Sequence, residues 1–170
     1  MSDAHGMDAY SPRDIASRVN EFCVVKARLP LLPLALLGVL AGAFIGLGAL
    51  MFTLVASDAG LGFAASRLLG GLAFSLGLIL VAVAGAELFT GNNLLAMGWA
   101  SGCVDTRGLL RNWVVVCVAN FIGAAGLAVL VWLSGHAALN GGNVGRTAVA
   151  IATVLGERLQ RSQVRAGAGL

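Results

Sequence analysis

The sequence has little charge for its length. Only 11% of its 170 residues are Asp, Glu, Lys or Arg, whereas a soluble domain carries about 25%. Proline (3 residues) and aromatic side chains (6%) are also scarce, while 58% of the residues are hydrophobic and 24 are glycine. Helices that pack closely in lipid rely on small residues where soluble cores use bulky ones. The composition therefore predicts an all-α integral membrane protein whose first partner is the lipid bilayer.

Residues that carry catalytic or metal chemistry are few as well. The 3 cysteines show no CxxC spacing, and the 2 histidines, His5 and His136, stand far apart, so neither a metal site nor a disulfide framework is expected. The sequence contains no nucleophile–base pair and no phosphate-binding loop, which argues against an enzyme and against a cofactor. A net charge of +3 is too small to indicate nucleic-acid binding.

Long apolar segments predict three membrane spans, because a helix needs about 20 residues to cross the hydrocarbon. The spans cover residues 29–57, residues 68–86 continued by 94–100 after an interruption, and residues 112–133. Accordingly, the chain divides into an N-terminal segment (1–28), a three-span membrane repeat (29–134) and an extracytoplasmic loop with an arginine-rich tail (135–170).

Polar segments flank the membrane repeat. Ser11 and Pro12 are typical of a helix start, as N-cap and first helical residue, with Asp14 near the positive end of the helix dipole. Apolar residues then recur at helical spacing, which predicts an amphipathic helix at the membrane interface. The segment after Val154 is rich in arginine and lacks helical periodicity, and we expect it to be poorly ordered.

Basic residues predict the orientation of the spans. Four of them precede the first span (Arg13, Arg18, Lys26 and Arg28), and two lie between the second and third (Arg107 and Arg111). The first connection has only Arg67. Since cytoplasmic loops carry the excess of Lys and Arg, we expect a multi-pass protein of the inner (plasma) membrane with a cytoplasmic N-terminus. The arginines after the third span favour the opposite orientation, because three spans would place them on the extracytoplasmic side.

The break segment, "GAELFTGNN" at residues 85–93, interrupts the second span with polar residues. A broken helix leaves backbone groups unsatisfied, and in lipid these are tolerated only where protein or water meets them. Side chains of Thr90, Asn92 and Asn93 are suited to bond exposed backbone, and Gly91 permits a positive φ. A second half-helix beginning near Leu94 would present its positive end to the break, which indicates an anion-attracting position in a membrane pore.

Glu87 within the break segment has two interpretations. Intramembrane carboxylates often serve as proton relays or gates. Alternatively, Glu87 fixes the loop by accepting hydrogen bonds from backbone N–H groups, and we favour this structural role because a bare negative charge would repel an anion.

Large apolar side chains flank the break segment. Phe74 and Leu78 lie four residues apart on one helix face, and Leu88 and Phe89 begin the loop. Such side chains beside a polar loop form a constriction in ion pathways, although lipid-facing or core positions fit them equally well.

Glycines repeat every fourth residue in the first span, at Gly38, Gly42 and Gly46. Their common face permits close approach of another helix, although glycine is frequent in membrane helices in general.

Three stretches together resemble the first half of the formate/nitrite transporter family. They are "SPRDIASRVNEFCVVKARLP" (11–30), "FSLGLILVAVAGAELFTGNNL" (74–94) and "RNWVVVCVANFIGA" (111–124), and the likeness covers residues 11–154. The resemblance implies one inverted three-helix repeat of an aquaporin-like six-helix fold, in a pentameric inner-membrane channel for small monovalent anions such as formate, nitrite or hydrosulfide. It implies an Ω-shaped gating loop at Leu88, Phe89, Thr90 and Gly91, constrictions at Phe74 and Leu78, and a supporting role for Asn120.

The family's second repeat, with its central histidine, has no counterpart in this sequence. An inverted-repeat pore needs both halves to pair its half-helix ends. We therefore expect a truncated chain, or one half of a split transporter that needs a second half-chain and does not conduct alone. The alternative is a non-conducting membrane scaffold or regulatory subunit that associates with a full-length transporter through its glycine face.

Overall fold

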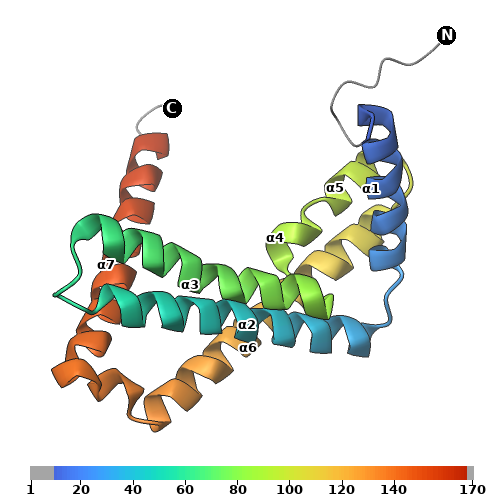
Figure 1. Ribbon diagram of the computed structural model, residues 1–170. Helices are drawn as coiled ribbons and strands as arrows, with labels where there is room; N and C mark the ends of the chain where they lie inside the picture. The colour runs from blue at the N-terminus through green and yellow to red at the C-terminus, as the bar shows by residue number, and fades with distance from the viewer. Residues whose placement is uncertain (1–9, 168–170) are drawn as a thin grey trace. The chain divides into compact units, whose positions relative to one another are not determined.

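The computed structural model describes residues 10–167, in which regular structure is entirely helical (Figure 1). The elements are α1 (Pro12–Ala27), α2 (Leu31–Ala56), α3 (Phe63–Ala84), α4 (Phe89–Asn92), α5 (Leu95–Ala100), α6 (Thr106–Leu133), the 3-10 turns η1 (His136–Ala138) and η2 (Asn140–Gly142), and α7 (Asn143–Gly167).

The helices α2, α3 and α6 are long and apolar enough to cross a membrane. Their order agrees with the predicted spans, and the all-α prediction is confirmed. The second span begins earlier than predicted, at Phe63 instead of Leu68. As a result, α3 alone has the length of a crossing, and the residues after the break segment are not needed to complete it.

The chain forms two compact units, and each contains parts of α2, α3 and α6. Within the described residues, the first unit comprises residues 10–43 together with Val81–Ala124, and the second comprises Phe44–Leu80 together with residues 125–167.

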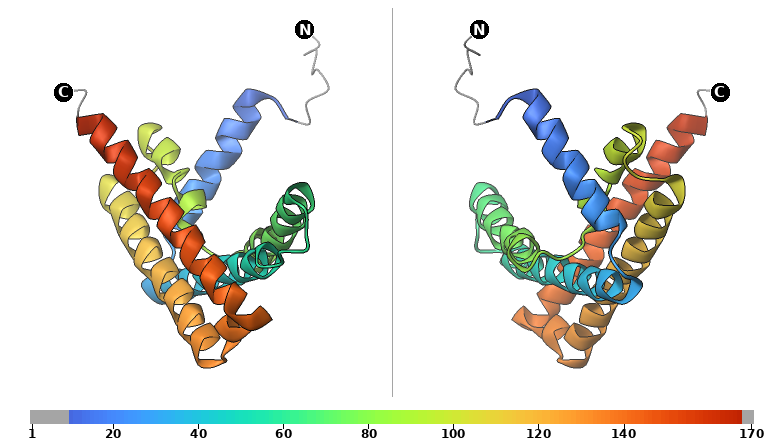
Figure 2. Two further views of the ribbon diagram at one scale, coloured as in Figure 1. Left: turned by 90° about the vertical axis from the view of Figure 1, so that its left-hand side faces the viewer. Right: turned by 90° about the vertical axis from the view of Figure 1, so that its right-hand side faces the viewer.

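In the first unit, α1 packs against α5, and the two helices lie side by side in Figures 1 and 2. The capping box at its start is as predicted: Asp14 N donates to Ser11 Oγ at 3.2 Å, and Ser11 N donates to the Asp14 carboxylate at 3.3 Å. Four buried residues from α1, α5, α6 and the connection between α5 and α6 form the core of this unit: Cys23, Leu95, Val104 and Leu109. Helix α1 is therefore part of the folded unit.

Glycines bring α2 and α6 together in the first unit. A Cβ at Gly38 would lie 2.7 Å from Ala119 Cβ, and one at Gly42 would collide with the Asn120 carbonyl group. The predicted close approach of another helix at these glycines is confirmed, and that helix is α6 of the same chain. A single copy of the chain therefore covers the face of Gly38 and Gly42 with its own α6.

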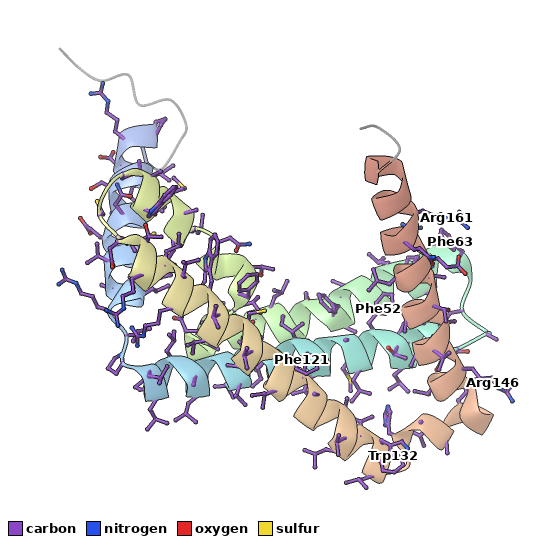
Figure 3. All side chains as sticks on the ribbon, turned by 180° about the vertical axis from the view of Figure 1, so that it is seen from behind. Phe52, Phe63, Phe121, Trp132, Arg146 and Arg161 are labelled. Atoms are coloured by element: carbon purple, nitrogen blue, oxygen red, sulfur yellow. The ribbon has the colours of Figure 1, made fainter. Side chains whose placement is uncertain are left out.

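In the second unit, glycines bring α2 and α3 together. A Cβ at Gly48 would lie 2.7 Å from the Phe74 carbonyl oxygen, and one at Gly77 would lie 2.7 Å from that of Phe44. Phe52 of α2 lies against Gly70 of α3, where a Cβ would be 2.9 Å from its ring (Figure 3). The close packing of small residues that is expected in lipid thus occurs in both units.

The chain remains helical beyond Val154. Helix α7 ends at Gly167, so the prediction of a poorly ordered tail is wrong as far as that residue. Arg161 lies 3.7 Å from the Glu157 carboxylate, one helical turn away, with side chains 79% and 67% exposed. Exposed pairs of this kind add little stability, but they are compatible with a helix that apolar periodicity alone did not reveal.

Candidate functional site: the helix break and its supports

The break segment starts where α3 ends. Gly85 has φ +61°, and the residues from Gly85 to Leu88 leave the helix before the single turn of α4 begins at Phe89. The prediction of a positive φ at Gly91 is wrong, because Gly91 lies within α4 and Gly85 makes the turn. The second half-helix, α5, begins at Leu95, in agreement with the predicted start near Leu94, and the single turn α4 at Phe89–Asn92 was not predicted. A positive φ is strained for any residue with a Cβ, so the glycine that permits the break is the first residue of the segment.

Asn120 of α6 joins the break segment to α2. Its side-chain Oδ1 accepts a hydrogen bond from Phe89 N at 2.9 Å. Its Nδ2 donates to the carbonyl oxygens of Glu87 (2.9 Å) and Gly38 (2.8 Å). One amide thus satisfies backbone groups at the start of α4 and just before it, which a helix end leaves open, and also bonds the interior of α2. Because Asn120 occupies the first N–H of α4, this group is not available to an anion.

Glu87 forms a buried ion pair with Lys26 of α1. The Lys26 ammonium lies 2.8 Å from Glu87 Oε2, and the two side chains are 12% and 5% exposed. A buried charge without a partner is costly, and here each charge meets the other. Lys26 is the only lysine of the chain, and its position beside Glu87 differs from the interfacial, topology-signalling position that the sequence suggested.

Asn92 and Asn112 complete a buried polar network around this pair. Asn92 Nδ2 donates to Glu87 Oε2 (2.8 Å) and to Asn112 Oδ1 (2.9 Å), and Asn92 Oδ1 accepts from the Lys26 ammonium at 2.9 Å. Asn112 Nδ2 in turn donates to the Lys26 carbonyl oxygen at 3.3 Å. Buried polar networks are stable only when their members are satisfied, and every polar atom of both amides has a partner here.

Trp113 and Arg111 support the same region from the start of α6. The Trp113 indole N–H donates to the Asn92 carbonyl oxygen at 3.0 Å. The Trp113 ring packs edge-to-face against the Phe89 ring, with 6.4 Å between the ring centroids. Arg111 donates to the carbonyl oxygens of Leu29 (2.7 Å) and Ala27 (3.5 Å), where a cation complements the C-terminal end of α1. Both residues therefore hold backbone in place.

The structure brings together only part of the predicted site. Glu87, Phe89, Asn92 and Asn120 are joined by the hydrogen bonds described above, and Leu88 is half-buried beside them. Two further residues of the break segment, Thr90 and Gly91, are exposed, as is Asn93. Phe74 and Leu78 belong to the second unit, where Phe74 is half-buried and Leu78 exposed. The predicted gating and constriction roles stay predictions.

Sequence reasoning missed four members of the site: Lys26, Arg111, Asn112 and Trp113. A signal for two of them was present. Asn112 lies eight residues before Asn120, on the buried stripe of α6 that also contains Val116, and Lys26 lies three residues after the buried Cys23. Polar residues in register with a buried stripe indicate a buried network rather than a solvated face.

Three apolar helices of spanning length and an interrupted helix fixed by buried polar side chains define a multi-pass α-helical membrane protein. Comparison with known families supports and sharpens this class. The model of the formate/nitrite transporter family matches residues 13–163, which extends beyond Val154, where the sequence had suggested that the likeness ends. The chain belongs to the formate/nitrite transporter family.

Individual relatives agree with this assignment. The chain is 38% identical to the formate channel FocA of Haemophilus influenzae over 68% of its own length and 41% of the relative's. It is 36% identical to FocA of Escherichia coli over 76% of its length and 46% of the relative's. A solved structure described as an FNT family ion channel superposes with a TM-score of 0.66 at 26% identity, covering 72% of this chain and 50% of the other. The chain spans less than half the length of these curated relatives.

Proposed function

We propose that the chain supplies one wall of a pore that carries small monovalent anions, of the formate, nitrite or hydrosulfide type, across the inner membrane. A second three-helix segment supplies the opposite wall. The observation that carries this proposal is the pairing of Glu87 with Lys26 at 2.8 Å. It removes the main objection to an anion path beside the break segment, which is the negative charge of Glu87.

An unpaired charge on Glu87 would obstruct an anion path. Opposite unit charges near a protein surface attract by about 4 kcal/mol at 4 Å, and an unpaired carboxylate would repel a passing anion by a similar amount. With Lys26 and two amide groups around it, Glu87 presents a locally neutral cluster. Its role in this proposal is structural, and it fixes the loop through a lysine and an asparagine instead of the backbone N–H groups first expected.

The exposed residues of the break segment are those that we assign to the pore. Thr90 and Gly91 are exposed, and a Cβ added at Gly91 would have no neighbour within 4 Å. Leu88 and Phe89 add apolar surface, and a narrow apolar ring makes ion passage depend on desolvation. Phe74 and Leu78 of α3 are proposed to line constrictions of the pore.

The proposal includes a cytoplasmic N-terminus and a pentameric assembly. Lys26 and Arg111, which contribute to the predicted orientation, bond to groups within the protein: Lys26 to the Glu87 carboxylate and Arg111 to the Leu29 carbonyl oxygen. Arg13, Arg18 and Arg107 are exposed, and these remain as topology signals. The scaffold alternative relied on a free glycine face, and it loses its support because Gly38 and Gly42 pack on α6.

A reconstitution experiment tests the transport proposal. The purified chain is placed in liposomes that contain a pH-sensitive dye, either alone or with a polypeptide carrying the second half of the Escherichia coli relative. A formate gradient should change the internal pH only when both are present. Flux through the chain alone would contradict the half-pore proposal. No flux with both halves, under conditions in which the intact relative conducts, would contradict transport.

A variant pair tests the proposed gate in the same liposomes. Phe89→Ala should widen the constriction and admit lactate, a larger monovalent anion that the unaltered protein is expected to exclude. Phe121→Ala, on the exposed surface of α6 (Figure 3), removes the same side chain away from the break segment and should leave selectivity unchanged. Equal lactate flux in the two variants would remove Phe89 from the gate.

A further inference from the structure

An open groove of about 660 Å³ runs along the first turns of α6 (yellow in Figure 2). Six residues of one helix face line it: Thr106, Arg107, Leu110, Arg111, Val114 and Val115. The polar residues are all at its upper end, within the first two turns of α6. Below them the lining is apolar, and Leu110 and Val114 are 52% and 62% exposed.

The polar end of the groove has the character of a membrane–water interface. The Trp99 indole N–H donates to Thr106 Oγ1 at 3.0 Å, and Trp99 is 49% exposed. Tryptophan, with a polar N–H on an apolar ring, is enriched at the headgroup level of membranes. A partly exposed tryptophan beside Thr106 therefore favours the headgroup level for the upper end of the groove.

Arg107 is the residue at this end that is available to a ligand. It is exposed and makes no hydrogen bond or ion pair with the residues that the structure describes. Arg111, by contrast, is engaged with the carbonyl oxygens of Ala27 and Leu29. An anion beside Arg107 would satisfy the free guanidinium, which binds phosphate in bidentate geometry.

We propose that this groove is a binding site for an anionic phospholipid, with the phosphate at Arg107 and an acyl chain along Leu110, Val114 and Val115. From Arg107 to Val115 the helix rises about 12 Å, which takes the groove from headgroup level into the hydrocarbon. A neighbouring protein chain is a poorer occupant, because an apolar surface over Arg107 would bury a guanidinium without a counter-charge.

Lipid retention in native mass spectrometry tests this site. The purified protein is incubated with an equal mixture of phosphatidylglycerol and phosphatidylcholine that carry the same acyl chains. The unaltered protein should retain phosphatidylglycerol preferentially. Arg107→Gln should lower the ratio of retained phosphatidylglycerol to phosphatidylcholine about fivefold, since one arginine contributes about 1 kcal/mol near an anionic surface.

Arg67→Gln is the matched control, since Arg67 is also exposed in the first turns of an apolar helix, over the Phe63 ring of α3. It should leave the ratio unchanged, and excess inorganic phosphate should not displace the lipid. The proposal is overturned if Arg107→Gln retains phosphatidylglycerol as the unaltered protein does. It is also overturned if Arg67→Gln lowers the ratio of phosphatidylglycerol to phosphatidylcholine as much as Arg107→Gln does. Displacement by phosphate would indicate a free-anion site, and a changed oligomeric state with unchanged lipid would indicate a protein neighbour. Either result would also overturn it.

Discussion

Replacing Lys26 by methionine should destabilise the protein strongly. Methionine matches most of the apolar length of lysine but removes the ammonium group that lies 2.8 Å from Glu87 and 2.9 Å from Asn92. Glu87 would then be a buried carboxylate, 5% exposed, with Asn92 as its remaining side-chain donor. Breaking a buried pair by removing one partner costs about 3–5 kcal/mol, and we expect Lys26→Met to lower the free energy of unfolding by that amount.

The double variant Lys26→Met/Glu87→Gln separates charge from packing. Glutamine keeps the shape of Glu87 and removes the unpaired charge, so the double variant should recover at least about 1.5 kcal/mol relative to Lys26→Met. Unfolding in detergent micelles is followed by the fluorescence of Trp113, which bonds Asn92 in the network, in a background where Trp99 and Trp132 are phenylalanine.

The exposed pair Arg161–Glu157 provides the control. Glu157→Gln should change the free energy of unfolding by less than about 0.5 kcal/mol, because both side chains of that pair are in solvent. A double variant that is no more stable than Lys26→Met alone would refute the buried pair as a source of stability. So would a loss from Glu157→Gln as large as that from Lys26→Met.

Three further predictions concern the break segment and its supports. Asn120→Ala removes the side-chain partner of three backbone groups and should cost about 2–4 kcal/mol in the same unfolding assay. Gly42→Ala forces a methyl group onto the Asn120 backbone and should cost about 1–3 kcal/mol, whereas Gly71→Ala on α3, with open space around it, should cost nothing. Gly85→Ala should cost about 1 kcal/mol because of its φ of +61°, and Gly91→Ala, in helical backbone, should be neutral. A larger loss of stability from Gly91→Ala than from Gly85→Ala would contradict the turn at Gly85.

The sequence was sufficient to predict what depends on composition and local signals. The apolar runs indicated the three spans, the Ser11–Asp14 capping box marked the start of α1, and the polar residues 85–93 marked the break. Long apolar segments and caps are determined by residues close in sequence. That is why the starts of the spans agree with the structure to within a few residues, the largest deviations being at α3 (Phe63 instead of Leu68) and α6 (Thr106 instead of residue 112).

The supports of the break segment could not be predicted because they join distant segments. Lys26 and Glu87 are 61 residues apart, and Asn92 and Asn112 are 20 apart. A lone lysine near the start of a span has the appearance of an interfacial anchor, and only its position beside Glu87 identifies a buried partner. The glycine turn was misplaced for a related reason, since both Gly85 and Gly91 were suitable and the choice between them depends on how α4 is held by Asn120.

The 61-residue separation of the buried pair has a consequence for biogenesis. At synthesis rates of about 5–20 residues per second, Lys26 emerges roughly 3–12 s before Glu87. During that interval the Lys26 ammonium lacks the Glu87 carboxylate and the Asn92 amide oxygen. The later network residue Asn112 must also enter the membrane region before the cluster is complete. The break segment therefore reaches its final form only after α6 has begun to insert. In a ribosome-bound intermediate that ends before Asn112, the loop should lack the hydrogen bonds of Asn112.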